Sequence, residues 1–279
     1  MKNIKFIKDN NFIYNDKIIS ELKNYNQSQT GYREKDKQNF YIFEDQDLVA
    51  IAHTKMASDW CHIMQIYYKN FDSLKALINN IKEFYKDKVE GIQYQSILAN
   101  RISDLKKLKF IQKGQLKDMV DGKDYVFLLT TDFTIDHEMD NYQKHTSDKQ
   151  LSKYDRIMKK ANQKIKKSLH YSSEDIDVQF VALDGDQFVG GIYGNYQYQY
   201  LFINILFVDK DYRGNNIASK LMDLIEEDAY NRGVYNLYLT TFEFQALGFY
   251  QKRNYKKIME IYDYPIGFKE YTVYKKLKE

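Results

Sequence analysis

The sequence holds one proline and one cysteine among 279 residues, and each scarcity excludes a class of structure. A single proline excludes proline-rich linkers. A single cysteine, Cys61, excludes an intrachain disulfide and a zinc site built on cysteines. The five histidines show no spacing typical of metal ligands. The sequence therefore predicts no metal centre.

Long apolar runs and a strong net charge are also absent. The run YLFINILFV (200–208) is too short to span a membrane and is interrupted by Asn204. The N-terminal stretch MKNIKFIKDNNF lacks the apolar core of a signal peptide. The formal net charge of +3 is small for a nucleic-acid-binding protein. We therefore expect a soluble cytoplasmic protein that binds neither a membrane nor a nucleic acid.

The second half of the chain alternates patterns of strand and helix typical of a mixed α/β fold. Two apolar runs flank the sequence DGD (184–186), which predicts a β-hairpin. Apolar residues at helical spacing end at Gly233, which predicts a helix with a glycine after its last turn. In chain order the predicted elements are a long helix at 141–170, strands at 177–183, 187–194 and 200–208, a helix at 217–233, a strand at 236–242, a short helix at 245–254 and two closing strands.

The first half repeats this order of elements. FYIFEDQDLVAIAH (40–53) matches QFVALDGDQFVGGIY (179–193), with Val49 aligned to Val189 at an offset of 140. The remaining counterparts in the first half are residues 61–68, 73–87, 91–98, 103–116 and 123–130. We therefore predict two tandem α/β copies, each a mixed, mostly antiparallel sheet flanked by helices. The predicted domains are 1–135 and 136–279.

The two copies differ at the loop DKDYRGNN (209–216), for which the first copy has only KNFDS (69–73). The first turn of a helix presents unpaired N–H groups and the positive end of its dipole, where a phosphate can bind. The loop offers small or moderate residues and Arg213, whose guanidinium can contact a phosphate oxygen. An ordinary strand-to-helix turn without a ligand is the alternative interpretation.

The stretch LFVDKDYRGNNIASKL (206–221), followed by a strand and then by FYQKRNY, resembles the GNAT acetyltransferase superfamily. The family pattern Arg/Gln-x-x-Gly-x-Gly/Ala appears here as Arg213-x-x-Asn216-x-Ala218. TTFEFQALGFYQKRNY and YDYPIGFKEYTVYKKL are similar to a branch that acts on small molecules. The resemblance covers about residues 140–279, and over 1–130 it concerns the fold alone, so the first copy looks like a degenerate domain without the cofactor loop.

Two asparagines, Asn216 and Asn254, replace glycines of the family pattern. Both are positions where a positive φ or a close backbone approach is wanted. Asparagine is the least costly substitute for glycine in the left-handed region. We therefore expect both replacements to be tolerated.

The resemblance implies an N-acetyltransferase that uses acetyl-CoA as co-substrate and acetylates the amine of a small molecule or amino acid by direct attack in a ternary complex. It implies a general acid, Tyr250, near the sulfur, because a phenol is neutral at pH 7 and can hydrogen-bond a developing thiolate. The cofactor-binding residues it implies are Leu206, Phe207 and Val208 along the pantetheine arm, Arg213, Gly214, Asn215, Asn216, Ile217, Ala218 and Ser219 at the pyrophosphate, and Thr241 at the end of the next strand.

The general base and the class of function are left open by the sequence. Glu243 is the nearest candidate base, whereas Asn204 stands where the similar branch often has an acid. A water chain, or an amine that is already neutral, would serve instead. A catalytically silent CoA-binding or partner-binding protein is a second hypothesis. An aminoacyl-tRNA-dependent peptidyltransferase is a third, but it would not need the phosphate loop. A homodimer is compatible with each.

Overall fold

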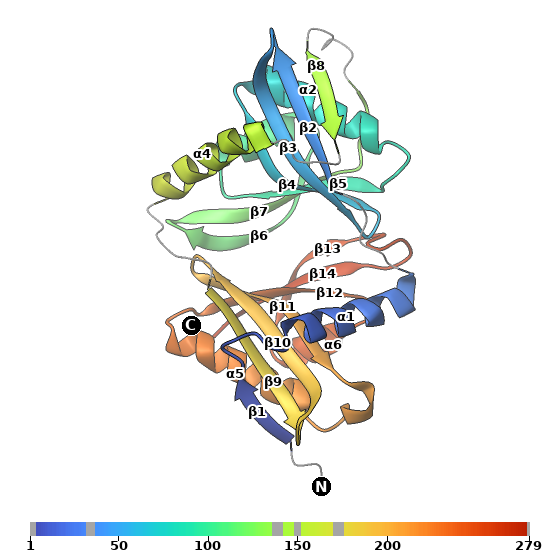
Figure 1. The fold of residues 1–279 in the computed structure, drawn as a ribbon, viewed down its shortest axis with the longest axis vertical. Helices are drawn as coiled ribbons and strands as arrows, with labels where there is room; N and C mark the ends of the chain where they lie inside the picture. Colours follow the sequence, from blue (N-terminus) through green and yellow to red (C-terminus); the bar gives the residue numbers. More distant parts are fainter. Residues whose placement is uncertain (1–3, 32–36, 136–141, 148–151, 170–175, 278–279) are drawn as a thin grey trace. The chain divides into compact units, whose positions relative to one another are not determined.

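The structure is a computed structural model, and it describes residues 4–31, 37–135, 142–147, 152–169 and 176–277. The chain divides into two compact units (Figure 1). Unit 1 comprises Met1–Tyr32, Ser173–Ile261 and Phe268–Glu279, and unit 2 comprises Arg33–Ser172 and Tyr262–Gly267. The predicted mixed α/β fold is confirmed, because each unit holds one seven-stranded sheet together with helices. No helix in the described ranges is long and apolar enough to cross a membrane.

Unit 1 is built on a sheet with the strand order β1-β9-β10-β11-β12-β14-β13. Neighbouring strands are antiparallel, except that β11 and β12 run parallel. The strands are β1 (Ile4–Lys8), β9 (Ile176–Asp184), β10 (Gln187–Gln197), β11 (Tyr200–Val208), β12 (Asn236–Phe242), β13 (Lys256–Ile261) and β14 (Glu270–Lys276). The helices are α1 (Asn15–Thr30), α5 (Ile217–Asn231), α6 (Leu247–Lys252) and the short 3-10 helix η2 (Lys210–Tyr212).

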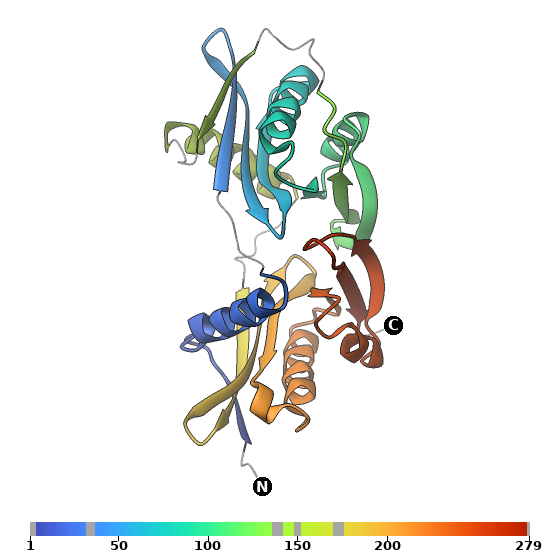
Figure 2. The ribbon, with the colours of Figure 1, turned by 90° about the vertical axis from the view of Figure 1, so that its right-hand side faces the viewer.

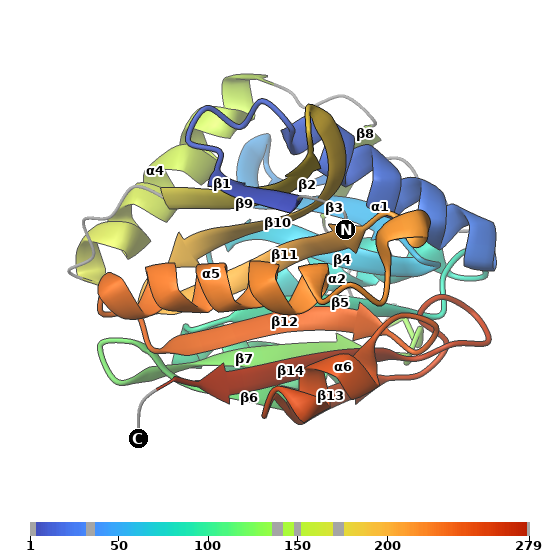
Figure 3. The same ribbon diagram turned by 90° about the horizontal axis from the view of Figure 1, so that it is seen from below.

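Different helices cover the two faces of this sheet (Figures 2 and 3). Side chains alternate along β9, so that Val181 joins a cluster with Ile18 of α1 whereas Ala182 joins the cluster that contains Leu221 of α5. Helix α1 approaches the sheet closely at Gly191. A Cβ atom added there would lie 2.5 Å from Cδ1 of Ile18, so this position admits no side chain unless Ile18 or α1 shifts.

Unit 2 has the strand order β6-β7-β5-β4-β3-β2-β8. Among the residues that the structure describes, β4 and β5 are its one parallel pair, and the other neighbouring strands are antiparallel. Its strands are β2 (Lys37–Glu44), β3 (Asp47–Ala57), β4 (Trp60–Tyr68), β5 (Gly91–Ser96), β6 (Ile111–Val120), β7 (Lys123–Thr130) and β8 (Gln143–Ser147). Its helices are α2 (Phe71–Tyr85), α3 (Ala99–Lys107) and α4 (Ser152–Ser168). The core of this unit gathers between α2 and the sheet.

The two sheets match strand for strand when one order is reversed. Their irregularities match as well. The pairing of β2 with β3 skips Val49, and the pairing of β9 with β10 skips Val189. The pairing of β3 with β4 skips Met64, and the pairing of β10 with β11 skips Asn204. Both pairs of bulges keep the sequence offset of 140, so the repeat extends to backbone detail.

The units do not follow the predicted division into 1–135 and 136–279. Strand β1 pairs with β9 and thereby joins the sheet of the second half, whereas β8 pairs with β2 and joins the sheet of the first half. The stretch expected as one long helix at 141–170 contains β8 and then α4. Local periodicity does not reveal which sheet edge a short strand will join, and this explains the difference.

Candidate active site

The parallel strands β11 and β12 separate halfway along the sheet of unit 1. They pair only from Tyr200 to Ile203 on β11 and from Asn236 to Leu239 on β12. A cavity of about 320 Å³ lies where the strands have parted. Its lining comes from α1, β11, the loop after it, α5, β12 and α6: Leu22, Tyr25, Ile203, Asn204, Ile205, Leu206, Phe207, Val208, Arg213, Ala218, Leu239, Thr240, Thr241, Gln245, Ala246, Phe249 and Tyr250.

A bulge at Asn204 shapes β11 where it borders the cavity. The pairing with β10 passes from Ile203 to Ile205, which leaves Asn204 as an extra residue that is exposed and lines the cavity. The bulge restarts the alternation of side chains beyond it. Phe207 then joins the cluster around α1, and Leu206 packs against the cluster under α5.

The three residues predicted to run beside the pantetheine arm, Leu206, Phe207 and Val208, all line the cavity. In an antiparallel pair, half of the N–H and C=O groups of a strand bond to its partner and half point to the other side. Strand β12 no longer pairs with this stretch of β11. The backbone groups that point away from β10 therefore border the cavity, where an extended ligand can pair with them.

The loop after β11 adopts the backbone conformations that its sequence suggested. Gly214 has a φ of 80° and Asn216 a φ of 58°, both in the left-handed region. Asn254, the second asparagine in place of a glycine, has a φ of 68°. The side chain of Asn215 donates from Nδ2 to the carbonyl oxygen of Tyr212 at 3.0 Å, which folds the loop onto itself. The expected positive φ of both asparagines is thus present.

A second cavity, of about 210 Å³, lies at the first turn of α5. Its lining residues are Val208, Tyr212, Arg213, Gly214, Asn216, Ile217, Ala218, Ser219 and Phe249. The N-cap residue Asn216 makes no side-chain hydrogen bond to this turn. The positive end of the helix dipole is therefore directed at a cavity without a capping side chain, which suits an anion. Of the predicted pyrophosphate residues, the structure brings all but Asn215 to this cavity.

The equivalent helix of unit 2 is closed at its first turn. Only two residues separate β4 from α2, and the N-cap residue Asn70 accepts a hydrogen bond from the backbone N–H of Ser73 at 2.8 Å. Ser73 Oγ accepts one from the backbone N–H of Asn70 at 3.1 Å, which completes a capping box. The first turn of α2 therefore has a side-chain partner for the backbone N–H of Ser73, whereas the first turn of α5 has no such partner from Asn216.

Arg213 belongs to both cavities. Its Nε donates to the carbonyl oxygen of Val208 at 3.1 Å, and its guanidinium carbon lies 5.3 Å from the centre of the Tyr25 ring. No acidic side chain within the described ranges forms an ion pair with it. Arg213 is therefore a fixed cation whose terminal nitrogens are available to a ligand.

Tyr250, the predicted general acid, lies on α6 and lines the larger cavity, and it is only 7% exposed. Burial raises the pKa of its phenol well above the usual value, so the hydroxyl is neutral at pH 7. Among the residues that the structure describes, no side chain hydrogen-bonds this hydroxyl. Its ring packs edge-on against Tyr255, with 5.9 Å between the ring centres.

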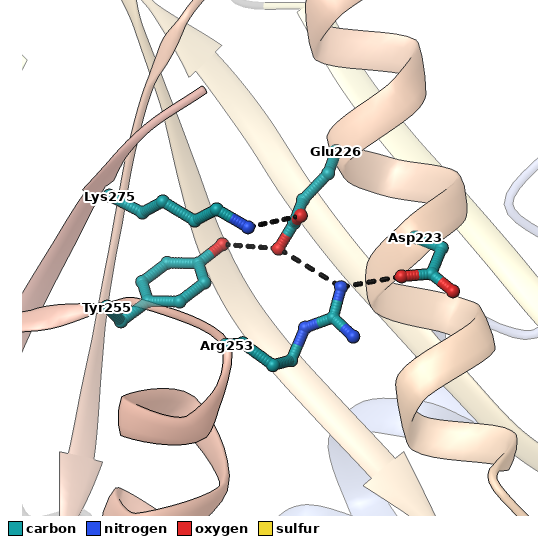
Figure 4. Close-up of polar contacts among 5 residues, drawn as sticks. All are labelled: Asp223, Glu226, Arg253, Tyr255 and Lys275. Atoms are coloured by element: carbon teal, nitrogen blue, oxygen red, sulfur yellow. Dashed lines mark hydrogen bonds and ion pairs between the residues drawn. The ribbon is translucent and has the colours of Figure 1, made fainter. Parts of the chain in front are cut away.

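A charged cluster holds the end of α6 against α5 (Figure 4). Glu226 of α5 accepts hydrogen bonds from Tyr255 at 3.2 Å and from Lys275 at 2.7 Å, and it pairs with Arg253 at 3.4 Å. Arg253 also binds Asp223 at 2.7 Å. Because Arg253 and Tyr255 lie within three residues of the end of α6, the cluster fixes the helix that carries the candidate acid.

A set of residues that the sequence did not single out connects α1 to the site. Gln245 donates from Nε2 to Asn26 Oδ1 at 2.8 Å, and its Oε1 accepts from the backbone N–H of Phe242 at 2.9 Å and from Thr241 Oγ1 at 3.2 Å. Thr241, a predicted cofactor residue, lines the cavity and takes part in this network. Gln245 lies within the TTFEFQALGFY segment, which could have indicated it, whereas no sequence pattern pointed to a part for α1 in the site.

Glu243, the candidate base, is not brought to the site. Its side chain is exposed and lines neither cavity, and its backbone N–H donates to the carbonyl oxygen of Lys269 at 2.8 Å. Where β11 and β12 border the larger cavity, the exposed polar residues are Asn204 and Thr240, and neither carries a carboxylate.

Comparison with known proteins gives consistent matches. Residues 137–255 match the acetyltransferase (GNAT) family. Over 92 residues the chain is 35% identical to the blasticidin-S acetyltransferase of Streptomyces morookaense, covering 33% of this chain and 68% of that protein. Over 75 residues it is 35% identical to an acetyltransferase of Agrobacterium fabrum, of which it spans 55%, with 27% of this chain covered.

Among solved structures, an acetyltransferase from Bacillus cereus matches with a TM-score of 0.42 and 25% identity. The match covers 48% of this chain and 97% of the Bacillus protein.

Proposed function

Because this chain belongs to the acetyltransferase (GNAT) family, we propose that it transfers the acetyl group of acetyl-CoA to the amine of a small molecule or an amino acid. The arrangement that best supports this function is the meeting of the two cavities at Arg213. One cavity offers the unpaired edge of β11 to an extended arm, and the other offers the first turn of α5 to an anion. CoA has an extended pantetheine arm that leads to an anionic pyrophosphate, so one CoA molecule can occupy both cavities.

In the proposed reaction the amine attacks the thioester carbonyl directly, within a ternary complex, and forms the new C–N bond. The C–S bond then breaks, and the electron pair leaves with sulfur. A backbone N–H group of β11 stabilises the oxyanion, and the neutral hydroxyl of Tyr250 hydrogen-bonds the developing thiolate. Because burial raises the pKa of this phenol, we assign it the donation of a proton or hydrogen bond and not the role of a base.

The attacking amine must also lose a proton. That Glu243 acts as the base stays a prediction. Its side chain is exposed and does not line the cavity, so its position does not favour this role. We propose instead that the acceptor reacts as the neutral amine and releases its proton to water near Asn204, where β11 is exposed. The rate at limiting acceptor should then rise with pH until the amine is deprotonated.

Unit 2 is proposed to be a GNAT-like copy that does not bind CoA. Two features support this role: its sheet has the strand order of unit 1, and the capping box of Asn70 and Ser73 closes the helix turn at which α5 is open. This makes the chain a tandem GNAT with one cofactor site. Calorimetry checks it directly, since one CoA per chain is expected and two would contradict it.

The function is tested by titrating acetyl-CoA in a calorimeter and then measuring thiol release with a panel of amines and amino acids. Blasticidin S belongs in the panel, because a relative with 35% identity is named for its acetylation. Tyr250→Phe should retain acetyl-CoA binding and lose turnover. Tyr230→Phe, an exposed position on α5 that lines neither cavity, is the matched control. Absence of binding at sub-millimolar acetyl-CoA would sink the proposal, and binding without turnover on any amine would favour a silent CoA-binding protein.

A further inference from the structure

Tyr25 of α1 lies beside the predicted phosphate-binding residue, although 188 positions of sequence separate it from Arg213. It lines the larger cavity together with Leu22 of the same helix. We propose that Tyr25 is a positioning residue of the cofactor site, which orients the Arg213 guanidinium toward the pyrophosphate of CoA. This inference rests on the proposed function and adds α1 to the cofactor site.

The contacts of Arg213 leave its terminal nitrogens for the ligand. The bond from Nε to the carbonyl oxygen of Val208 fixes one edge of the guanidinium. The ring of Tyr25, 5.3 Å away, attracts the cation and limits the rotation of its plane. A guanidinium held at its Nε edge and beside a ring presents its remaining N–H groups in a fixed direction, as bidentate binding of phosphate oxygens requires.

Tyr25 is itself held in place. Its hydroxyl donates to the carbonyl oxygen of Phe244 at 3.3 Å, and the two rings lie 6.4 Å apart. One residue further along α1, Asn26 accepts the hydrogen bond from Gln245. Tyr25 and the residue after it thus anchor the helix to the loop between β12 and α6. The ring therefore does not need to be ordered when CoA binds.

The competing explanation is that Tyr25 only fills the cavity wall. A filling role depends on the volume of the side chain and is independent of Arg213. A positioning role requires the aromatic face and acts only through Arg213. The two explanations therefore differ in the response to Tyr25→Leu, which keeps apolar volume, and in the effect of Tyr25 variants when Arg213 is absent.

The test is calorimetric titration of CoA into the full chain and into five variants: Tyr25→Leu, Tyr25→Phe, Arg213→Ala, the double variant Tyr25→Leu/Arg213→Ala, and the control Tyr230→Leu. A cation–ring contact at an exposed site corresponds to about a two- to fivefold change in affinity. Tyr25→Leu should weaken CoA binding by about this factor. Tyr25→Phe should weaken it less than Tyr25→Leu, because it keeps the ring and loses only the hydroxyl bond to Phe244, and the control Tyr230→Leu should bind like the unaltered chain. Thermal melting confirms that each variant is folded.

The double variant decides between the explanations. If Tyr25 acts through Arg213, Tyr25→Leu causes no further loss once Arg213 is alanine. The inference is overturned if Tyr25→Leu lowers CoA affinity equally with Arg213 present and with Arg213→Ala, or lowers it in neither case. The proposed function would still stand, because the unaltered chain would bind CoA. If the unaltered chain binds no CoA, both are overturned.

Discussion

The side-chain amide of Gln245 donates a hydrogen bond to Oδ1 of Asn26 at 2.8 Å, and so joins the loop before α6 to the N-terminal helix α1. Asn26 is only 7% exposed, so the bond lies largely out of solvent. The oxygen of the same amide accepts from Thr241 and from the backbone N–H of Phe242. One amide therefore connects α1, β12 and the loop before α6, all of which contribute residues to the lining of the larger cavity.

The Asn26–Gln245 bond should be measurable as a coupling energy. We expect Asn26→Ala and Gln245→Ala each to lower the free energy of unfolding, with an interaction of about 0.5–1.5 kcal/mol between them in a double-mutant cycle. Gln245→Ala should have the larger effect, because it also leaves the Phe242 N–H without its partner. Urea denaturation measures all four proteins, and strict additivity would show that the bond contributes nothing.

The division of the chain predicts which segments are needed for CoA binding. A protein of residues 136–279, the domain suggested by the sequence, lacks β1 and α1 and so leaves β9 with an open edge. It also carries β8 without its partner β2. We expect this segment to bind CoA at least tenfold more weakly than the full chain, or not to fold, because the α1 wall of the cavity is absent.

The matched control joins residues 4–31 to 176–277 through a flexible Gly/Ser linker. This protein contains every strand of the unit 1 sheet and every residue that lines the two cavities. Calorimetry should show that it recovers CoA binding. Full binding by residues 136–279 alone would contradict the role given to α1.

The sequence predicted what depends on neighbouring residues. Local steric preferences account for three of the predicted features: the turn at Gly185 (φ 60°), the glycine after α5 at Gly233 (φ 75°) and the left-handed conformation of Asn216. The pairing of β1 with β9 depends on a sheet edge that forms more than 160 positions later in the sequence, and no local pattern reports it. The sequence suggested Glu243 as a base because it is near the site along the chain, but the end of β12 leaves it exposed.

Gly191 should be intolerant of even a methyl group. A Cβ at this position would lie 2.5 Å from Cδ1 and 2.8 Å from Cγ1 of Ile18, a side chain with no exposed surface. We expect Gly191→Ala to destabilise the protein by about 1–3 kcal/mol, since α1 or Ile18 must shift. Gly248→Ala is the control, because its Cβ would meet nothing within 4 Å. Partial recovery in Gly191→Ala/Ile18→Val would identify the clash as the cause, and an unchanged melting midpoint for Gly191→Ala would contradict it.

Asn216 should be replaceable by glycine but not by alanine. Its φ of 58° costs a residue with an ordinary Cβ about 1–2 kcal/mol, and glycine nothing. Asn216→Ala should therefore lower both stability and CoA affinity, since the residue lines the cavity at α5. Asn254, with a φ of 68° and outside both cavity linings, is the matched site. There Asn254→Ala should lower stability and leave CoA affinity unchanged, so equal affinity losses at both sites would refute the distinction.

Asp228 should make stability depend on pH. Burial would raise the pKa of this carboxyl, but hydrogen bonds from Lys8 of β1, from Tyr196 and from Arg232 outweigh burial and hold the pKa below its usual value. A carboxyl whose pKa is lower in the folded state stabilises the protein above its unfolded pKa of about 3.9, and this contribution is lost as the pH falls through the folded pKa.

Asp228→Asn is therefore expected to cost about 1–3 kcal/mol near pH 7, because it removes a charge that three donors share. The difference from the unaltered chain should begin to shrink as the pH falls below about 4, and it should vanish only below the lowered folded pKa, where both folded proteins carry a neutral side chain at this position. Glu227→Gln removes the same charge from the next, exposed residue of α5 and should change the free energy of unfolding by less than about 0.5 kcal/mol. Urea denaturation of all three proteins between pH 3 and 8 measures these differences in the free energy of unfolding. If Asp228→Asn lowered that free energy by the same amount over the whole range, the ionised carboxylate would not be what joins β1 to α5.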